Sequence, residues 1–158
     1  MAWIEGSTLG HVIRESGPWT YPIVNLTHVL GVSTLFGSIL LLDLRLLGLG
    51  RRRVPLPALA DAAVPAAMAG FVVAALTGVG LLAANATDYV DNPFIYIKFP
   101  AIAVGLVNVV VLTRSAAWRA RRTRDLAPGE QRQLAVVAAI SLGSWLTAVT
   151  AGRLIGYW

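Results

Sequence analysis

The stretch that decides the fold is YPIVNLTHVLGVSTLFGSILLLDLRLLGLG, residues 21–50. From Ile23 to Leu42 it holds twenty residues without a formal charge. A helix that rises 1.5 Å per residue needs about 20 apolar residues to cross a bilayer core of roughly 30 Å. We therefore interpret this stretch as a membrane-spanning helix that contains His28 and ends near the charged residues Asp43 and Arg45.

The composition of the whole chain agrees with a membrane protein. The 158 residues are 56% hydrophobic and 13% charged, whereas soluble domains are about 25% charged. Further apolar runs predict an all-α, integral membrane four-helix bundle that forms a single domain over residues 1–158. Residues 1–20 place apolar side chains near helical spacing, which indicates a short N-terminal interfacial amphipathic helix. The expected spans are residues 22–48, 57–85, 93–115 and 131–156.

The distribution of basic residues predicts the orientation. The loops after the first and third spans, with Arg45 counted in the first, hold ten of the thirteen basic residues, and the loop 85–93 holds none. Basic loops stay in the cytoplasm. We therefore expect both termini and the loop 85–93 to face the side opposite to the cytoplasm. The basic segment 114–132 is expected to extend the third helix and then turn at Pro128-Gly129.

Composition and motifs also exclude several functions. The net charge of +5 comes from arginines between apolar spans, a pattern that explains topology better than binding of nucleic acid. The absence of cysteine excludes disulfides and thiolate metal sites. Motifs of zinc proteases, P-loop proteins and serine hydrolases are missing. Whether the protein is an enzyme stays open.

The candidate site lies near the outer ends of the spans. His28, Lys98 and Arg153 each lie a few residues inside a span, within roughly 10 Å of the same outer face at 1.5 Å per residue. Asn25 shares the helical side of His28. Gly31 leaves space beside the imidazole for a flat ligand or for another helix.

Simpler roles compete with a ligand site. Ionisable groups inside spans are candidates for function, but Lys98 and Arg153 near the span ends could instead reach lipid phosphates. His28 could make only an interhelical hydrogen bond. Asp43, Arg45 and Asn108 are interpreted as structural polar residues. In this interpretation Asp43 pairs with a basic residue at the end of a neighbouring helix, and Arg45 contacts lipid phosphate or acts as a topology signal.

The residue types at the candidate site suit haem. A neutral imidazole is a good axial ligand for haem iron, and two cations can pair with the haem propionates. His11, outside the spans on the same side, would be the second ligand in a bis-histidine site; otherwise a partner supplies it or the iron stays five-coordinate. We expect one haem b and electron transfer with a quinone or a periplasmic redox partner.

Two alternatives remain open. The first is a cofactor-free subunit or anchor of a larger membrane complex, or a homo-oligomer, in which His28 and Lys98 join helices. The second is transport or binding of a small anion or of copper, for which His28 and His11 would be the metal ligands.

The string YPIVNLTHVLG, followed by LLDLRLLG, resembles an uncharacterised family of small bacterial four-helix membrane proteins with the motif YPxVNxxH…DLRLLG. The similarity continues through Thr77-Gly78 and NPFIYIKFPAIAVGLVN. More distantly, the first span and the segment from Lys98 to Asn108 resemble the CopD-type copper-resistance domain, which is grouped with four-helix b-type cytochromes. The resemblance implies a bacterial inner membrane, in which both termini would be periplasmic. It also implies a redox or metal role and marks five positions: His28, Asp43, Arg45, Lys98 and Asn108.

Overall fold

The computed structural model describes residues 19–84 and 91–157, which form four long helices and no strand. All four are long and apolar enough to cross a membrane, so the expected all-α membrane bundle is confirmed. The predicted interfacial segment, with His11, lies outside the described residues except for its last two positions. The long helices are α3 (Thr20–Leu47), α4 (Leu56–Ala84), α5 (Pro93–Arg114) and α7 (Pro128–Leu154).

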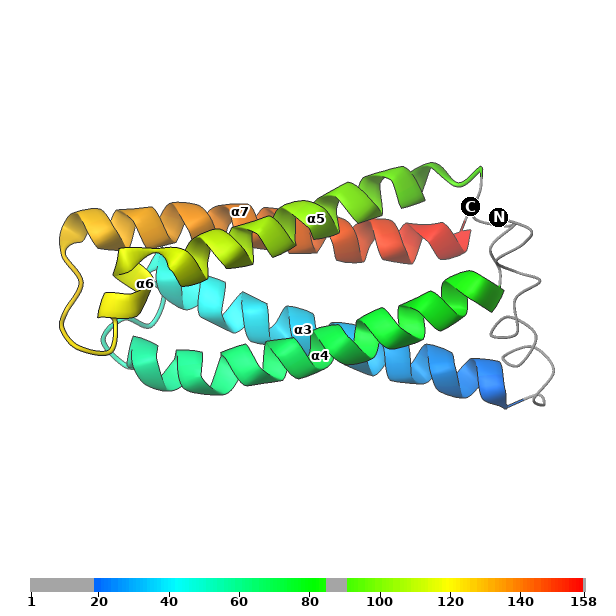
Figure 1. Ribbon diagram of the computed structural model, residues 1–158, viewed down its shortest axis with the longest axis horizontal. Coiled ribbons are helices and arrows are strands. Elements are labelled where there is room, and N and C mark those ends of the chain that lie inside the picture. Colours follow the sequence, from blue (N-terminus) through cyan, green and yellow to red (C-terminus); the bar gives the residue numbers. More distant parts are fainter. Residues whose placement is uncertain (1–18, 85–90, 158) are drawn as a thin grey trace.

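The helices pack as two antiparallel hairpins. Helix α3 packs against α4, and α5 packs against α7; α3 also packs against α7 and so joins the hairpins. The hairpins separate toward the end where α3 begins and α7 ends (Figure 1). The outward faces are apolar, with exposed side chains such as Leu26, Leu76, Val107 and Leu146. Such faces suit contact with lipid rather than water.

Both hairpins have defined ends. Gly48 follows α3 in a left-handed conformation with a φ of 113° and donates its N–H to the carbonyl of Arg45, as glycine commonly does at a helix C-terminus. Asn92 precedes α5, and its side chain accepts from Phe94 N at 3.0 Å. Asn92 Nδ2 also donates to the carbonyl of Ile155 at 3.2 Å. This amide ties the start of α5 to the short 3₁₀ turn η1 (Ile155–Tyr157) that follows α7.

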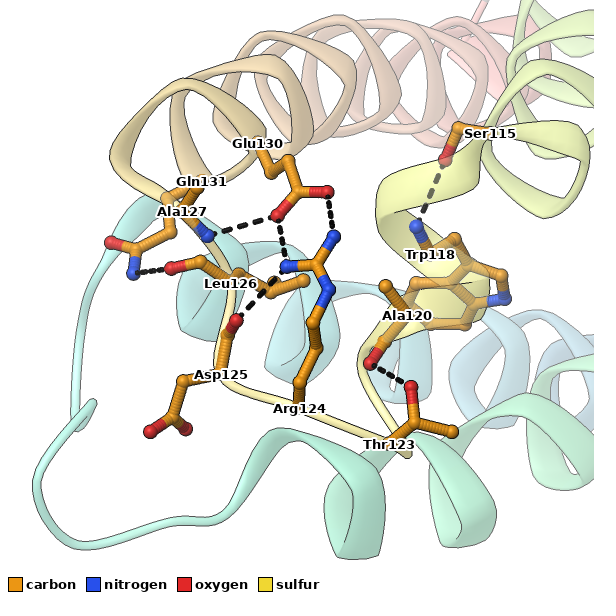
Figure 2. A network of polar contacts seen from close by, with 10 residues as sticks. All are labelled: Ser115, Trp118, Ala120, Thr123, Arg124, Asp125, Leu126, Ala127, Glu130 and Gln131. Carbon is orange, nitrogen blue, oxygen red and sulfur yellow. Dashed lines mark hydrogen bonds and ion pairs between the residues drawn. The ribbon is translucent and has the colours of Figure 1, made fainter.

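The basic segment differs from the expected helical extension. Helix α5 ends at Arg114, and Ser115 accepts a hydrogen bond from Trp118 N to begin the short helix α6 (Ala116–Ala120). Pro128 and Gly129 form the first turn of α7 rather than a separate turn, because proline suits the first helical position. Glu130 accepts from Ala127 N at 2.9 Å and fixes this start (Figure 2).

The core is uneven along the bundle axis. The end that carries α6 buries large apolar side chains, and we call it the packed half: Leu42, Leu46, Leu112, Trp118 and Leu134. A smaller cluster of Leu35, Ile39 and Trp145 lies toward the middle. Toward the start of α3 and the end of α7, the buried apolar residues that the structure describes are only glycine and alanine, and we call this end the small-residue half: Gly31, Ala74, Gly80, Ala83, Ala84, Ala148 and Ala151.

Glycines set the close approach of α3 and α4. A Cβ on Gly70 would lie 2.5 Å from Leu35 N, and a Cβ on Gly31 would lie 2.9 Å from Ala74 N. Both distances are shorter than van der Waals contact with backbone. The crossing of the two helices therefore depends on small residues, as is common between membrane helices.

Candidate functional site

His28 lies at the interface of α3 and α4 in the small-residue half. The imidazole is half-buried, and its Nδ1 lies 3.0 Å from Thr77 Oγ1. The Thr77 hydroxyl donates its own hydrogen to the carbonyl of Val73 at 2.6 Å. A hydroxyl has one hydrogen to give, so it accepts the second bond from Nδ1–H. The Nε2 atom of His28 then keeps a lone pair for which the described residues offer no donor.

Two further groups of α4 lie beside the imidazole. The carbonyl of Ala74, which is an acceptor only, also interacts with the imidazole and lies 3.4 Å from Thr77 Oγ1. Gly78 closes the same edge: a Cβ there would lie 3.1 Å from His28 Cε1. The ring orientation is therefore set by α4, through two acceptors and a glycine.

Lys98 is the described charged residue whose electrostatic effect reaches the His28 imidazole. It is half-buried on α5, and its ammonium interacts electrostatically with the imidazole. Its terminal atoms pass over α7 at Gly152, where a Cβ would lie 3.6 Å from Nζ. Lys98 forms no ion pair with any residue that the structure describes. Among the described residues, no carboxylate would compete with an anionic group for this cation.

The other predicted site residues are arranged differently. Arg153 is exposed at the same end, and its guanidinium stacks on the Tyr157 ring at 4.6 Å and donates to its hydroxyl. Asn25 is exposed. Gly31 is buried against α4, so the space beside it is taken by a helix. His11 lies outside the described residues.

Asp43, Asn108 and Arg45 lie toward the opposite end of the bundle. Asp43 is 3% exposed, and the Ser141 hydroxyl is placed to hydrogen-bond with its carboxyl group. Asn108 Nδ2 donates to the carbonyl of Val137 at 3.0 Å. Arg45 Nε donates to the carbonyl of Val54 at 2.6 Å. Asp43 therefore joins α3 to α7, Asn108 joins α5 to α7, and Arg45 braces the loop that follows α3.

Sequence reasoning missed two partners. Thr77 sets the tautomer of His28 and is the single hydroxyl residue of α4, a signal that could have been read. Ser141 has no such signal, because hydroxyl residues recur along α7. No group of three or more His, Cys, Asp or Glu that could hold a metal ion occurs in the described part of the chain.

Four apolar helices with polar side chains between them define a multi-pass integral membrane protein. A family model matches residues 1–158, and the chain belongs to this family, which is described as a family of unknown function (DUF6644). No curated protein and no solved structure matches the chain.

Proposed function

We propose that this protein holds one b-type haem through Nε2 of His28 and carries electrons in a bacterial cytoplasmic membrane. The observation that supports the proposal most is the pair of hydrogen bonds at Thr77, which assigns the proton to Nδ1. Histidines that ligate metals commonly donate their other ring N–H to a neighbouring acceptor, which fixes the ring and strengthens the ligand. His28 has this arrangement.

The composition of the small-residue half also fits a bound group. The residues buried there are small, and the cation of Lys98 has no carboxylate partner among the described residues. A haem carries two carboxylates that need cations near the membrane surface. In this proposal Lys98 pairs with one carboxylate, and Arg153 turns from Tyr157 to pair with the other.

When bound, the haem would supply one-electron redox chemistry. This chain's residues would bind and orient it: His28 would supply Nε2 to the iron, and Thr77 would hold the imidazole ring. The spans would keep water away from the bound group. His28 is the only histidine of the described residues, so a second ligand would come from His11 or from a partner chain, or the iron would have none. With both termini periplasmic, the exchange partner is a periplasmic redox protein or a quinone.

The same geometry also serves a protein without a cofactor. In such a membrane subunit the contact between His28 and Thr77 would be an interhelical hydrogen bond and nothing more. A copper site would use the same Nε2 atom. These alternatives predict different absorption spectra and metal contents, so one experiment separates them.

The test is an absorption spectrum of the full-length protein, purified in mild detergent from cells supplied with haem. We expect a Soret band in the wild type that shifts in Thr77→Val and disappears in His28→Ala. The control is Thr147→Val, which removes an exposed hydroxyl of α7 and should leave the band unchanged. Thermal unfolding of each variant confirms that it is folded. A colourless wild-type protein would refute the haem, and copper found by metal analysis of that sample would support the copper alternative.

A further inference from the structure

An open cavity of about 840 Å³ lies at the end of the bundle opposite to His28. It forms where the loop between α3 and α4 faces the segment between α6 and α7. Arginine is the most frequent residue type of its lining, and the arginine side chains come from both segments and from the end of α3. These arginines are Arg45, Arg51, Arg121, Arg122 and Arg124.

Two of the five arginines are neutralised within the protein. Arg122 forms an ion pair with Asp61 of α4. Arg124 binds both carboxylate oxygens of Glu130, at 2.7 and 2.8 Å (Figure 2). These hydrogen bonds raise the pKa of Arg124. Both side chains therefore hold the cavity wall together and have little charge left to offer.

The other three arginines have only neutral partners among the described residues. Arg45 donates to the carbonyl of Val54, and Arg51 Nη1 donates to Gln131 Oε1 at 2.7 Å. Gln131 in turn donates to the carbonyl of Leu126 at 2.8 Å. Arg45 and Arg51 are close enough to repel each other. The guanidinium groups are thus held in place while their charge remains uncompensated.

Arg121 is held by an aromatic ring. Its guanidinium lies 3.7 Å above the ring of Trp118 and donates to the Trp118 carbonyl. Its Nε is buried without a hydrogen-bond partner among the described residues. Burial and the nearby charge of Arg122 lower the pKa of Arg121, and the attraction of the Asp61 carboxylate opposes this shift in part. No described carboxylate forms an ion pair with Arg121, because Asp61 pairs with Arg122.

One carboxylate also lines the cavity. Asp125 is exposed, and its side chain points away from the Arg124 guanidinium (Figure 2). It cannot balance three cations. The lining therefore keeps an excess of positive charge, although like charges held close together are costly unless an anion joins them.

We propose that this cavity binds a phosphate-bearing anion through Arg45, Arg51 and Arg121. Guanidinium groups match phosphate oxygens through paired hydrogen bonds. Groups that are already held in position lose less freedom when they bind. The anion is either the headgroup of an acidic phospholipid, which basic pockets at the cytoplasmic ends of helices recognise, or a soluble phosphate.

The positive-inside rule does not account for this arrangement. Topology requires basic residues in the loop, and Arg52 and Arg53 meet that requirement as exposed side chains outside the cavity. It does not require arginines fixed around one cavity by backbone carbonyls, glutamine and tryptophan. The neighbouring arginines therefore provide a matched control with the same change in charge.

The experiment is calorimetric titration of the full-length protein in a neutral detergent at fixed ionic strength. Short-chain phosphatidylglycerol, short-chain phosphatidylcholine and inorganic phosphate are titrated separately into wild type, Arg51→Gln and Arg52→Gln. We expect Arg52→Gln to bind like wild type and Arg51→Gln to bind about tenfold or more weakly, because a charge-assisted contact is lost. Arg121→Lys, which keeps the charge and loses the paired N–H donors of the guanidinium group, should also weaken binding.

Each outcome decides the proposal. Binding of phosphatidylglycerol but neither phosphate nor phosphatidylcholine identifies a lipid headgroup site, and binding of inorganic phosphate identifies a soluble ligand. Equal weakening in Arg51→Gln and Arg52→Gln would mean attraction by general surface charge and would overturn the proposal. The proposal would also be overturned if the wild type bound neither phosphatidylglycerol nor inorganic phosphate.

Discussion

The two halves of the bundle differ in what they bury. The packed half encloses leucines and Trp118, whereas the small-residue half encloses glycine and alanine beside His28 and Lys98. Large side chains that interlock fix one arrangement of helices. In the half without them, the described residues offer neither a hydrogen-bond donor for the remaining imidazole nitrogen nor an ion-pair partner for Lys98. We therefore expect the packed half to contribute most to stability, and the small-residue half is where we propose that haem binds.

The largest expected effect is in the packed half. Trp118 is 5% exposed and supports Arg121, so Trp118→Ala should lower the free energy of unfolding by about 3–5 kcal/mol. Trp19→Ala, at a side chain that is 75% exposed, is the control and should change it little. Reversible unfolding in mixed micelles measures both variants. Equal losses would mean that burial does not distinguish these sites.

The crossing of α3 and α4 gives the next effect. Gly70→Ala places a methyl group 2.5 Å from Leu35 N, and we expect a loss of about 1–3 kcal/mol from overpacking. Gly37→Ala, where a Cβ meets nothing within 4 Å, should be neutral or slightly stabilising. The same unfolding measurement compares them. A harmless Gly70→Ala would show that the helices do not cross at this distance.

A smaller effect is expected for a buried hydrogen bond of the packed half. Asn108→Ala removes the bond to the Val137 carbonyl and should cost about 1 kcal/mol, since hydrogen bonds between membrane helices are modest. Thr113→Ala, which removes an exposed hydroxyl of the same helix, serves as the control. A cost above that of Trp118→Ala would contradict the ranking by packed volume.

Gly78→Ala tests the small-residue half. Its new methyl group would lie 3.1 Å from His28 Cε1, and a side chain can move where backbone cannot. The free energy of unfolding should therefore change by less than about 1 kcal/mol, whereas the Soret band shifts or weakens. Gly143→Ala, in open space on α7, should change neither. A large loss of stability without a change in the Soret band would mean that Gly78 serves helix packing and not the proposed haem site.

Much of the fold was predictable because long uncharged runs have one solution in a bilayer, a helix. The break at Ser115 and the helical start at Pro128 were not predicted, since they depend on local caps. For the site, the position of His28 was predicted from depth alone. Its contact with Thr77 was not, because depth does not specify which faces of two helices meet. A helix beside Gly31 was one of the two predicted alternatives, but depth did not specify that this helix is α4.

The most direct test of the account replaces the His28 side chain and supplies it from solution. His28→Gly removes the imidazole, and we expect purified protein to lose its Soret band. Added free imidazole should restore the band with the spectrum of imidazole-ligated haem, because the nitrogen returns to the space beside Thr77. A His28→Gly protein that binds haem as well as wild type without added imidazole would contradict the account.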